Sequence, residues 1–220
     1  NNRASVVEAF DGIAVRSQNH WPSLSMDVGV LNDVASPLFT AGFYYKTFMW
    51  PPKAWAKVYE PFIRRAAGLG TAPTAPDPDH YVHSHVHADV LIAGGGPAGL
   101  AAALAASASG KRVILADEQD RPGGSLLHDT TSTIDGLPAR AWVARTLEEL
   151  GRRENVRILS RTTVFGHFNH NHIALCERLT DHLRQPPPGQ ARERLWQVRA
   201  GQVIVATGAH ERPLVFANND

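Results

Sequence analysis

The sequence predicts an α/β protein in which a parallel sheet flanked by helices follows a smaller β-rich module. An apolar run without alternation, Asp89 to Ala93, leads into the glycine-rich turn 94–99 and then into an Ala- and Leu-rich segment, Leu100 to Ser109. After Gly110 comes a second apolar run, Val113 to Ala116. Such runs are typical of parallel strands buried on both faces, and Ala and Leu favour helix. The order strand, turn, helix, strand predicts a βαβ unit.

Composition places the chain among ordinary globular proteins. It has 220 residues, of which 43% are hydrophobic and 20% charged, and its net charge is +1. This charge does not suggest a nucleic-acid or membrane-surface partner, and no apolar run is long enough to span a bilayer. The start of the chain has neither a signal peptide nor an initiator Met, so we expect a cytoplasmic protein that is processed or a piece of a longer chain.

Changes in composition along the chain predict two domains. Residues 1–70 are rich in aromatic and turn residues and form a small module, in which Val6–Val15 predicts two short strands around an Asp-Gly turn. Within this module, residues 53–67 have helical apolar spacing. Residues 71–87 form a linker rich in Pro and small residues, and residues 88–220 form the second domain.

Three glycines of the turn predict a phosphate site. Gly94 allows the tight turn out of the strand, Gly96 lets the backbone approach a pyrophosphate, and Gly99 lets the helix pack closely on the strand. The N–H groups at the start of the helix then face the pyrophosphate. These features predict a Rossmann-type dinucleotide-binding fold.

Further features strengthen this prediction. Glu118 lies 19 residues after Gly99, where a carboxylate accepts hydrogen bonds from the adenosine ribose and repels a 2′-phosphate. Gly123-Gly124 allows a second close approach of the backbone, and Gln202–Gly208 predicts a strand entering a small-residue turn. Arg121 could instead bind a 2′-phosphate and select NADP, but Glu118 argues against that.

At this point the sequence resembles the alpha subunits of heterotetrameric sarcosine oxidases. The resemblance spans nearly the whole chain, and its aromatic and Asn-rich strings are more specific than the glycine motif. It is carried by the segments Trp21–Ser23, Asp27–Gly29, Ala41–Phe48, Gly94–Gly99, Ala116–Gln119, Gly123–Leu126, Val205–Ala209 and Glu211–Asp220.

The resemblance implies a multi-subunit flavoprotein that oxidatively demethylates sarcosine. Oxygen is the electron acceptor, and the products are glycine, hydrogen peroxide and formaldehyde or methylene-tetrahydrofolate. It implies NAD on this alpha subunit, FMN and FAD elsewhere in the complex, partner beta, gamma and delta subunits, and sarcosine on beta. Residues assigned to the NAD site are Gly94, Gly95, Gly96, Pro97, Ala98, Gly99, Asp117, Glu118, Gln119, Arg121, Gly124, Ser125, Val164, Ala206, Thr207 and Gly208.

Two departures from the family follow. Family members continue beyond the position of Asp220 into a second dinucleotide lobe and a folate-binding half, so we expect a fragment or a split subunit. The first module also resembles a ferredoxin-like segment that holds a [2Fe–2S] cluster in cyanide-forming and opine-oxidising relatives. Such a cluster needs four Cys thiolates, and residues 1–70 contain none. We therefore predict a ferredoxin-like module without a cluster.

Other polar groups have a functional and a simpler interpretation. His83, His85 and His87, with His80, could bind a metal, but we favour an exposed strand and predict no metal site. Cys176, the single cysteine, could be reactive, but its apolar neighbours favour a small buried side chain.

The remaining clusters lead to no catalytic assignment. The polar residues 167–172 could face another subunit or a flavin, although a loop packed by side-chain hydrogen bonds is favoured. The aromatic residues 43–50 form either a partner surface or a small core. No catalytic acid, base or nucleophile stands out by spacing.

Two rival functions stay open. One is an FAD-binding oxidoreductase of the pyridine nucleotide–disulfide type, although the redox Cys pair expected near Gly124-Ser125 is missing. The other is a non-catalytic assembly subunit with an empty site.

Overall fold

The computed structural model describes residues 7–14, 20–34, 37, 42, 48–67 and 74–209. It divides the chain into two units: the first comprises residues 1–3 and 12–78, and the second comprises residues 4–11 and 79–220. The glycine-rich turn lies in the second unit.

Short helices dominate the described part of the first unit. Strands β1 (Pro22–Ser23) and β2 (Met26–Asp27) form a hairpin, followed by η2 (Val28–Val30) and α1 (Leu31–Val34). The predicted helix at 53–67 is confirmed as one helical run made of η4 (Pro52–Ala54), the π-helix η5 (Trp55–Tyr59) and α3 (Glu60–Ala66). Pro61 fits because it lies in the first turn of α3, where a missing N–H is tolerated.

The two strands expected at residues 6–15 are wrong for the described residues 7–14. This stretch contains a turn at Asp11-Gly12, where Gly12 has φ +87°, but no strand. The Asp-Gly pair predicted the turn correctly. A strand also needs a partner strand to complete its hydrogen bonds, and the sequence alone does not identify one. The ferredoxin-like module stays a prediction. Residues 43–47, which make up most of the aromatic segment 43–50, lie outside the described residues.

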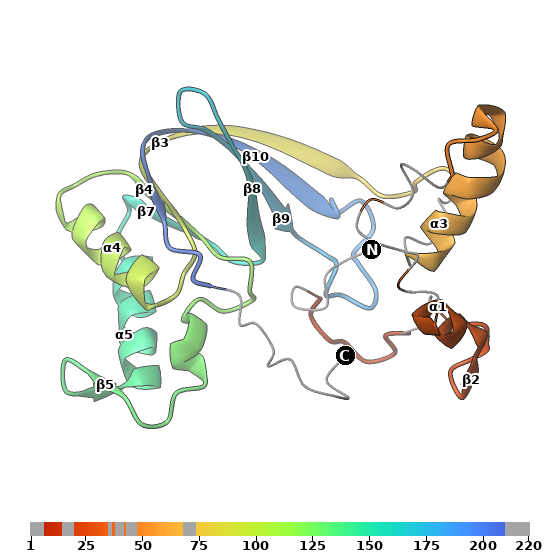
Figure 1. Cartoon of the computed structure of the whole chain (residues 1–220). Helices are drawn as coiled ribbons and strands as arrows, with labels where there is room; N and C mark the ends of the chain where they lie inside the picture. The colour runs from red at the N-terminus through yellow and green to blue at the C-terminus, as the bar shows by residue number, and fades with distance from the viewer. Residues whose placement is uncertain are drawn as a thin grey trace. The chain divides into compact units, whose positions relative to one another are not determined.

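The second unit is built on one six-stranded mixed sheet (Figure 1). Its strand order is β7-β4-β3-β10-β9-β8, in which the first four strands are parallel and β9 is antiparallel to both β10 and β8. The expected parallel sheet is therefore confirmed in part, because β8 and β9 join the same sheet as an antiparallel hairpin. The strands are β3 (Tyr81–Ala93), β4 (Val113–Ala116), β7 (Val156–Leu159), β8 (Thr162–Phe168), β9 (His172–Arg178) and β10 (Glu193–Val205).

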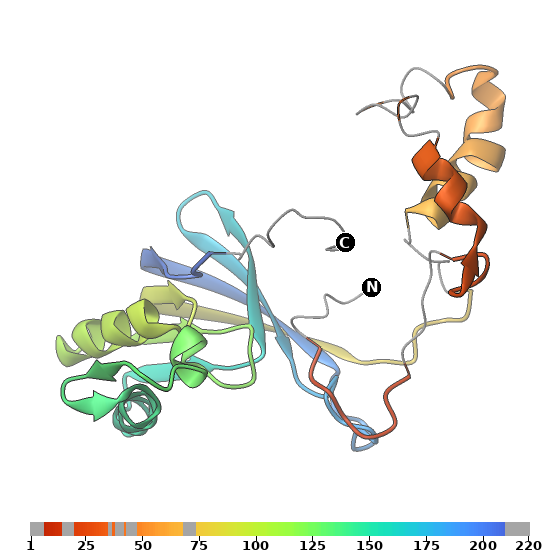
Figure 2. The ribbon, with the colours of Figure 1, turned by 60° about the horizontal axis from the view of Figure 1, so that its bottom comes forward.

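Two helices cover one face of the sheet. Figures 1 and 2 show α4 (Pro97–Ala108) and α5 (Ala139–Gly151) on the same side, with the small hairpin of β5 (Thr133–Ile134) and β6 (Leu137–Pro138) beside α5. Gly110 has φ +73° just after α4, as expected for a glycine that ends a helix. Within the described part of the chain, no helix is both long and apolar enough to cross a bilayer.

The carboxyl half of β3 is buried on both faces. Val90 and Ile92 pack in the core beneath the helices, and Leu91 and Ala93 pack in a second core on the opposite face. This two-sided burial explains why the strand shows no alternation in the sequence. A shorter helix, η6 (Gly124–Leu127), contributes Leu126 to the core beneath the helices.

The amino half of β3 extends beyond the helices and pairs with β10. Residues 81–87, which we assigned to the linker, are strand because Glu193–Arg199 of β10 pair with them in parallel register. Here Val86 and Ala88 face the second core, so His83, His85 and His87 point to the other side, where all three are exposed. The expected exposed histidine strand is confirmed.

Candidate dinucleotide-binding site

The glycine-rich turn between β3 and α4 is shaped by close contacts within the protein. Gly94 has φ +103°, and a Cβ added to it would lie 2.3 Å from the carbonyl oxygen of Ala206. A Cβ on Gly99 would lie 1.9 Å from the carbonyl oxygen of Gly94, and one on Gly95 would lie 2.8 Å from Cβ of Pro122. The tight turn and the close helix packing predicted for Gly94 and Gly99 are therefore confirmed.

Gly96 differs from the other glycines of this turn. A Cβ added to it would have no atom of the described residues within 4 Å, and its φ of −69° is available to any residue. Gly96 is the N-cap of α4, and no side chain caps this helix. The first N–H groups of a helix lack partners within the helix and attract anions together with the helix dipole. The turn thus offers open space and donors at the same point.

Asp117 lies beneath the turn and holds it. Its carboxylate is buried and accepts hydrogen bonds from the main-chain N–H groups of Gly95 at 2.5 Å and Gln119 at 2.8 Å. Both oxygens are thus engaged by the backbone. We had assigned Asp117 to the cofactor itself, and the structure gives its carboxylate an internal positioning contact. The signal available in the sequence was its place directly after a buried strand.

Glu118 and its neighbours follow β4 at the same edge of the sheet. Glu118 is half-buried, and Gln119 and Arg121 are exposed. Among the described residues, the Glu118 carboxylate has no hydrogen-bond or ion-pair partner. Within this part of the chain, the carboxylate is therefore available to a ligand. The roles of Gln119 and Arg121 stay predictions.

The second glycine pair contacts the first turn. Gly123 donates its N–H to the carbonyl oxygen of Gly95 at 2.7 Å, and a Cβ added to Gly124 would lie 3.0 Å from Cα of Gly96. Gly123 and Gly124 have φ values of +145° and +55°. The close backbone approach is therefore to the glycine turn, and contact of Gly124 and the exposed Ser125 with a ligand stays a prediction.

An open pocket of about 250 Å³ adjoins the turn on the face opposite the helices. It brings together two predicted site residues from distant segments, Val164 of β8 and Thr207 after β10, next to Ala93. The N–H of Ala206 donates to the carbonyl oxygen of Ala93 at 2.7 Å, which fixes the end of β10 against the turn. The other lining residues are Phe165, Gly166, His167, Ile173, Val203 and Val205.

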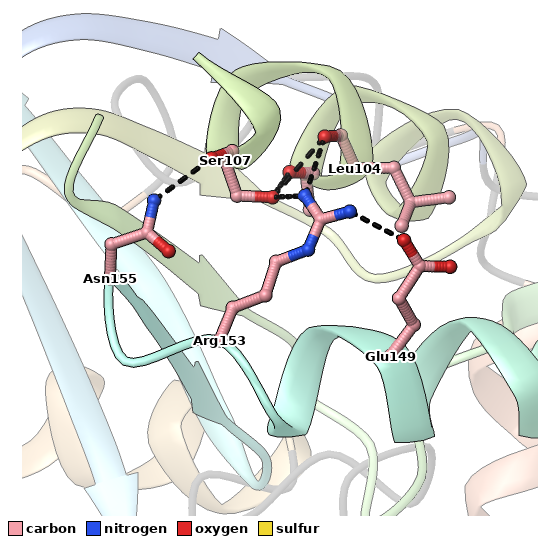
Figure 3. Close-up of polar contacts among 6 residues, drawn as sticks. Leu104, Ser107, Glu149, Arg153 and Asn155 are labelled. Atoms are coloured by element: carbon pink, nitrogen blue, oxygen red, sulfur yellow. Dashed lines mark hydrogen bonds and ion pairs between the residues drawn. The ribbon is translucent and has the colours of Figure 1, made fainter. Parts of the chain in front are cut away.

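The far end of α4 is fixed by side chains that we did not single out from the sequence (Figure 3). Arg153 donates to the carbonyl oxygen of Leu104 at 3.0 Å and to Oγ of Ser107 at 2.5 Å, and it forms an ion pair with Glu149. Asn155 donates to the carbonyl oxygen of Ser107 at 3.0 Å. These donors satisfy carbonyl groups near the helix end, where a cation also suits the dipole. The helix that points at the turn is thus held at its other end.

The other polar clusters lie away from the turn or have local roles. His167 Nε2 and Asn171 Oδ1 are 3.2 Å apart, as favoured for a loop packed by side-chain hydrogen bonds. Burial and the nearby Glu193 raise the pKa of Cys176 to about 11, so its thiolate is scarce at neutral pH. Among the described residues, no three His, Cys, Asp or Glu side chains are arranged to hold a metal ion.

Comparison with known proteins agrees with this geometry. The family model described as FAD dependent oxidoreductase matches residues 89–185, which include the turn, Asp117 and Glu118. Sarcosine oxidase subunit alpha of Rhizobium meliloti (strain 1021) is 53% identical over 220 residues, which is 100% of this chain and 22% of that protein. The chain is a homologue of sarcosine oxidase subunit alpha.

Further similarities support this homology and the fold. Sarcosine oxidase subunit alpha of Corynebacterium sp. (strain P-1) is 51% identical over 154 residues, covering 70% of this chain and 16% of that protein. The chain thus spans about a fifth of the length of these curated relatives. The crystal structure of L-proline dehydrogenase from P. horikoshii is similar in fold, with a TM-score of 0.51 at 24% identity, covering 68% of this chain and 28% of that one.

Proposed function

We propose that this chain binds NAD at the glycine turn, as part of the alpha subunit of a sarcosine-oxidising complex. In this proposal the pyrophosphate lies against Gly96 and the first turn of α4, and Glu118 accepts hydrogen bonds from the adenosine ribose. Homology to sarcosine oxidase subunit alpha supports the choice of complex. The cofactor site residues assigned from the sequence enter the proposal with one change, because Asp117 acts by holding Gly95.

One observation carries the nucleotide proposal. Three glycines of the turn lack side chains because the protein itself occupies the space, whereas the space beside Gly96 is open. A bulky anion can approach the backbone there, and the uncapped helix start supplies donors. A turn that served packing alone would need glycine at 94, 95 and 99 but not at 96.

FAD is the second candidate for the same site. The description of the matching family model favours it, and FAD contains the same ADP group that the turn and Glu118 would hold. Mass spectrometry of the nucleotide released from the purified complex by denaturation distinguishes the two. Because the proposed complex also holds FAD elsewhere, the released nucleotides are quantified: NAD supports the main proposal, FAD in excess of that other site without NAD supports the alternative, and neither NAD nor excess FAD supports an assembly subunit with an empty site.

The reaction proposed for the complex is the demethylation of sarcosine. Two electrons leave the N-methyl group, hydrolysis of the resulting imine gives glycine and formaldehyde, and oxygen accepts the electrons as hydrogen peroxide. Tetrahydrofolate would capture the one-carbon unit as methylene-tetrahydrofolate. We assign the flavins FMN and FAD and the sarcosine site to other parts of the complex with beta, gamma and delta subunits. This chain would supply cofactor binding and orientation.

The ribose assignment has its own test. Calorimetric titration of NAD into the complex carrying Glu118→Ala should show about tenfold weaker binding than the unmodified complex, since a hydrogen bond to a charged group is lost. Glu154→Ala is the matched control, because it removes an exposed carboxylate between Arg153 and Asn155, which contact the far end of α4, and it should leave the affinity unchanged. Equal affinity of the Glu118 variant and the unmodified protein would exclude Glu118 as the ribose ligand.

A further inference from the structure

Hydrogen bonds to three consecutive main-chain carbonyl groups, those of residues 117–119, hold the backbone at Glu118. The carbonyl oxygens of residues 117 and 119 accept hydrogen bonds from the main-chain N–H groups of Thr162 at 2.7 Å and Arg161 at 2.8 Å. Between them, the carbonyl oxygen of Glu118 accepts a hydrogen bond from the guanidinium group of Arg178. The first two bonds need no particular side chain, whereas the third depends on arginine.

Arg178 is itself well placed to hold this peptide group. It is the last residue of β9, its main-chain N–H donates to the carbonyl oxygen of Arg161 at 3.0 Å, and its side chain is partly buried. Arg161 is fixed in turn by an ion pair with Glu8 at 2.6 Å. The main chain of Arg178 is therefore hydrogen-bonded to Arg161, and Arg161 is hydrogen-bonded to the segment that the Arg178 guanidinium contacts.

The main-chain carbonyl group and the side-chain carboxylate of Glu118 differ in their contacts. Its carbonyl group is bound by Arg178, while its carboxylate has no partner among the described residues. Loss of the hydrogen bond from Arg178 would leave the main chain at Glu118 less tightly held, and the direction of the Glu118 side chain depends on that main chain. Binding sites gain affinity when the groups that meet the ligand are already oriented.

We propose that Arg178 is a positioning residue for nucleotide binding, which sets the orientation of the Glu118 carboxylate toward the ribose by holding the Glu118 carbonyl group. This inference rests on the proposed function, because it assumes that a nucleotide ribose meets Glu118. Arg178 would not touch the nucleotide. Its effect would pass entirely through Glu118.

A double-mutant cycle on the complex tests this. The affinity for NAD is measured by calorimetry for the unmodified complex, Arg178→Ala, Glu118→Ala and the double variant. We expect Arg178→Ala to weaken binding about three- to tenfold, the range that one hydrogen bond supports, and to have almost no further effect when Glu118 is already alanine. A role in folding alone would lower the thermal midpoint without this dependence on Glu118.

Arg199 offers a matched control. It also donates from its guanidinium to a main-chain carbonyl, that of His170 at 3.1 Å, in the turn between β8 and β9. Arg199→Ala removes the same charge and kind of contact, and should leave the affinity within about twofold.

The outcomes separate the two proposals. If the unmodified complex neither contains nor binds NAD, the proposed function fails and the role of Arg178 in NAD binding fails with it. If the complex binds nucleotide but Arg178→Ala binds equally well, the positioning role alone is overturned. The same holds if Arg178→Ala weakens binding to the same degree with and without Glu118, because the effect would then be a general one of charge.

Discussion

The two halves of β3 show how differently one strand can be used. In Figure 1 the carboxyl half lies on the part of the sheet that the helices cover and leads into the glycine turn, whereas the amino half extends past them. Val90 to Ala93 are buried, and the turn that follows has backbone contacts closer than any side chain would allow. His83, His85 and His87 are exposed on the amino half.

This contrast teaches that missing side chains can indicate a candidate site as clearly as side chains do. Three histidines in alternation look like a metal site in the sequence, yet in the structure they form the solvent face of a paired strand. At the other end, Gly96 leaves open space beside the start of α4, which has no side-chain cap. The predictions below test this difference, starting with the largest expected effect.

Gly99→Ala should destabilise the protein most. Alanine normally favours a helix over glycine by about 1 kcal/mol, but here its Cβ would lie 1.9 Å from the carbonyl oxygen of Gly94. We expect the free energy of unfolding to fall by about 3 kcal/mol, as measured in denaturant. Gly151→Ala is the matched control: Gly151 ends α5, a Cβ added to it would contact no neighbouring element among the described residues, and the substitution should be neutral or slightly stabilising. Equal effects of the two substitutions would contradict the close packing.

Asp117→Asn should have the next largest effect. An amide in place of the buried carboxylate puts an NH₂ group opposite one of the two backbone N–H donors, from Gly95 or Gln119. The loss in unfolding free energy should be about 1–3 kcal/mol, because a buried donor is left without a partner. Asp129→Asn changes an aspartate that accepts two backbone N–H groups in an exposed turn, and it should cost less. An Asp129 variant that is the less stable of the two would overturn this ranking.

Asp89 lies where the two halves of β3 meet, and its ion pair predicts a pH dependence. The hydrogen bonds from Arg112 lower the pKa of Asp89 from 3.8 to about 2 in the folded protein. Because the folded value is the lower one, the pair stabilises the protein above about pH 4, and this contribution is lost as the pH falls toward 2. Melting curves of the unmodified protein and Asp89→Asn should therefore differ above pH 4 and converge near pH 2. A constant difference across this range would show that the charge of Asp89 is unimportant.

Replacing His83, His85 and His87 together by alanine should have the smallest effect. These side chains are exposed, so we expect a change in unfolding free energy below about 0.5 kcal/mol per residue. Thermal melts with and without added Zn²⁺ give the measurement. A large zinc-dependent stabilisation of the unmodified protein that disappears in the triple variant would restore the metal interpretation.

Sequence reasoning located the βαβ unit because its signals are local. The burial of Val90 to Ala93, the turn at Gly94 and the helix end at Gly110 each follow from a few adjacent residues. Contacts between distant segments were not predictable in this way. The bond from Arg178 to Glu118 joins residues that are 60 positions apart, and the pairing of residues 81–87 with β10 depends on a strand that begins at Glu193.

Gly96→Ala tests the central claim most directly, because it separates ligand space from protein packing. The added methyl group meets no atom in the part of the chain that the structure describes, and the backbone angles suit alanine, so the unfolding free energy should change by less than about 1 kcal/mol. Calorimetric titration with NAD should nevertheless show binding weakened about tenfold or more, because the methyl group occupies the space beside the pyrophosphate. Unchanged affinity in a stable Gly96→Ala complex would contradict the claim that this open space receives a dinucleotide.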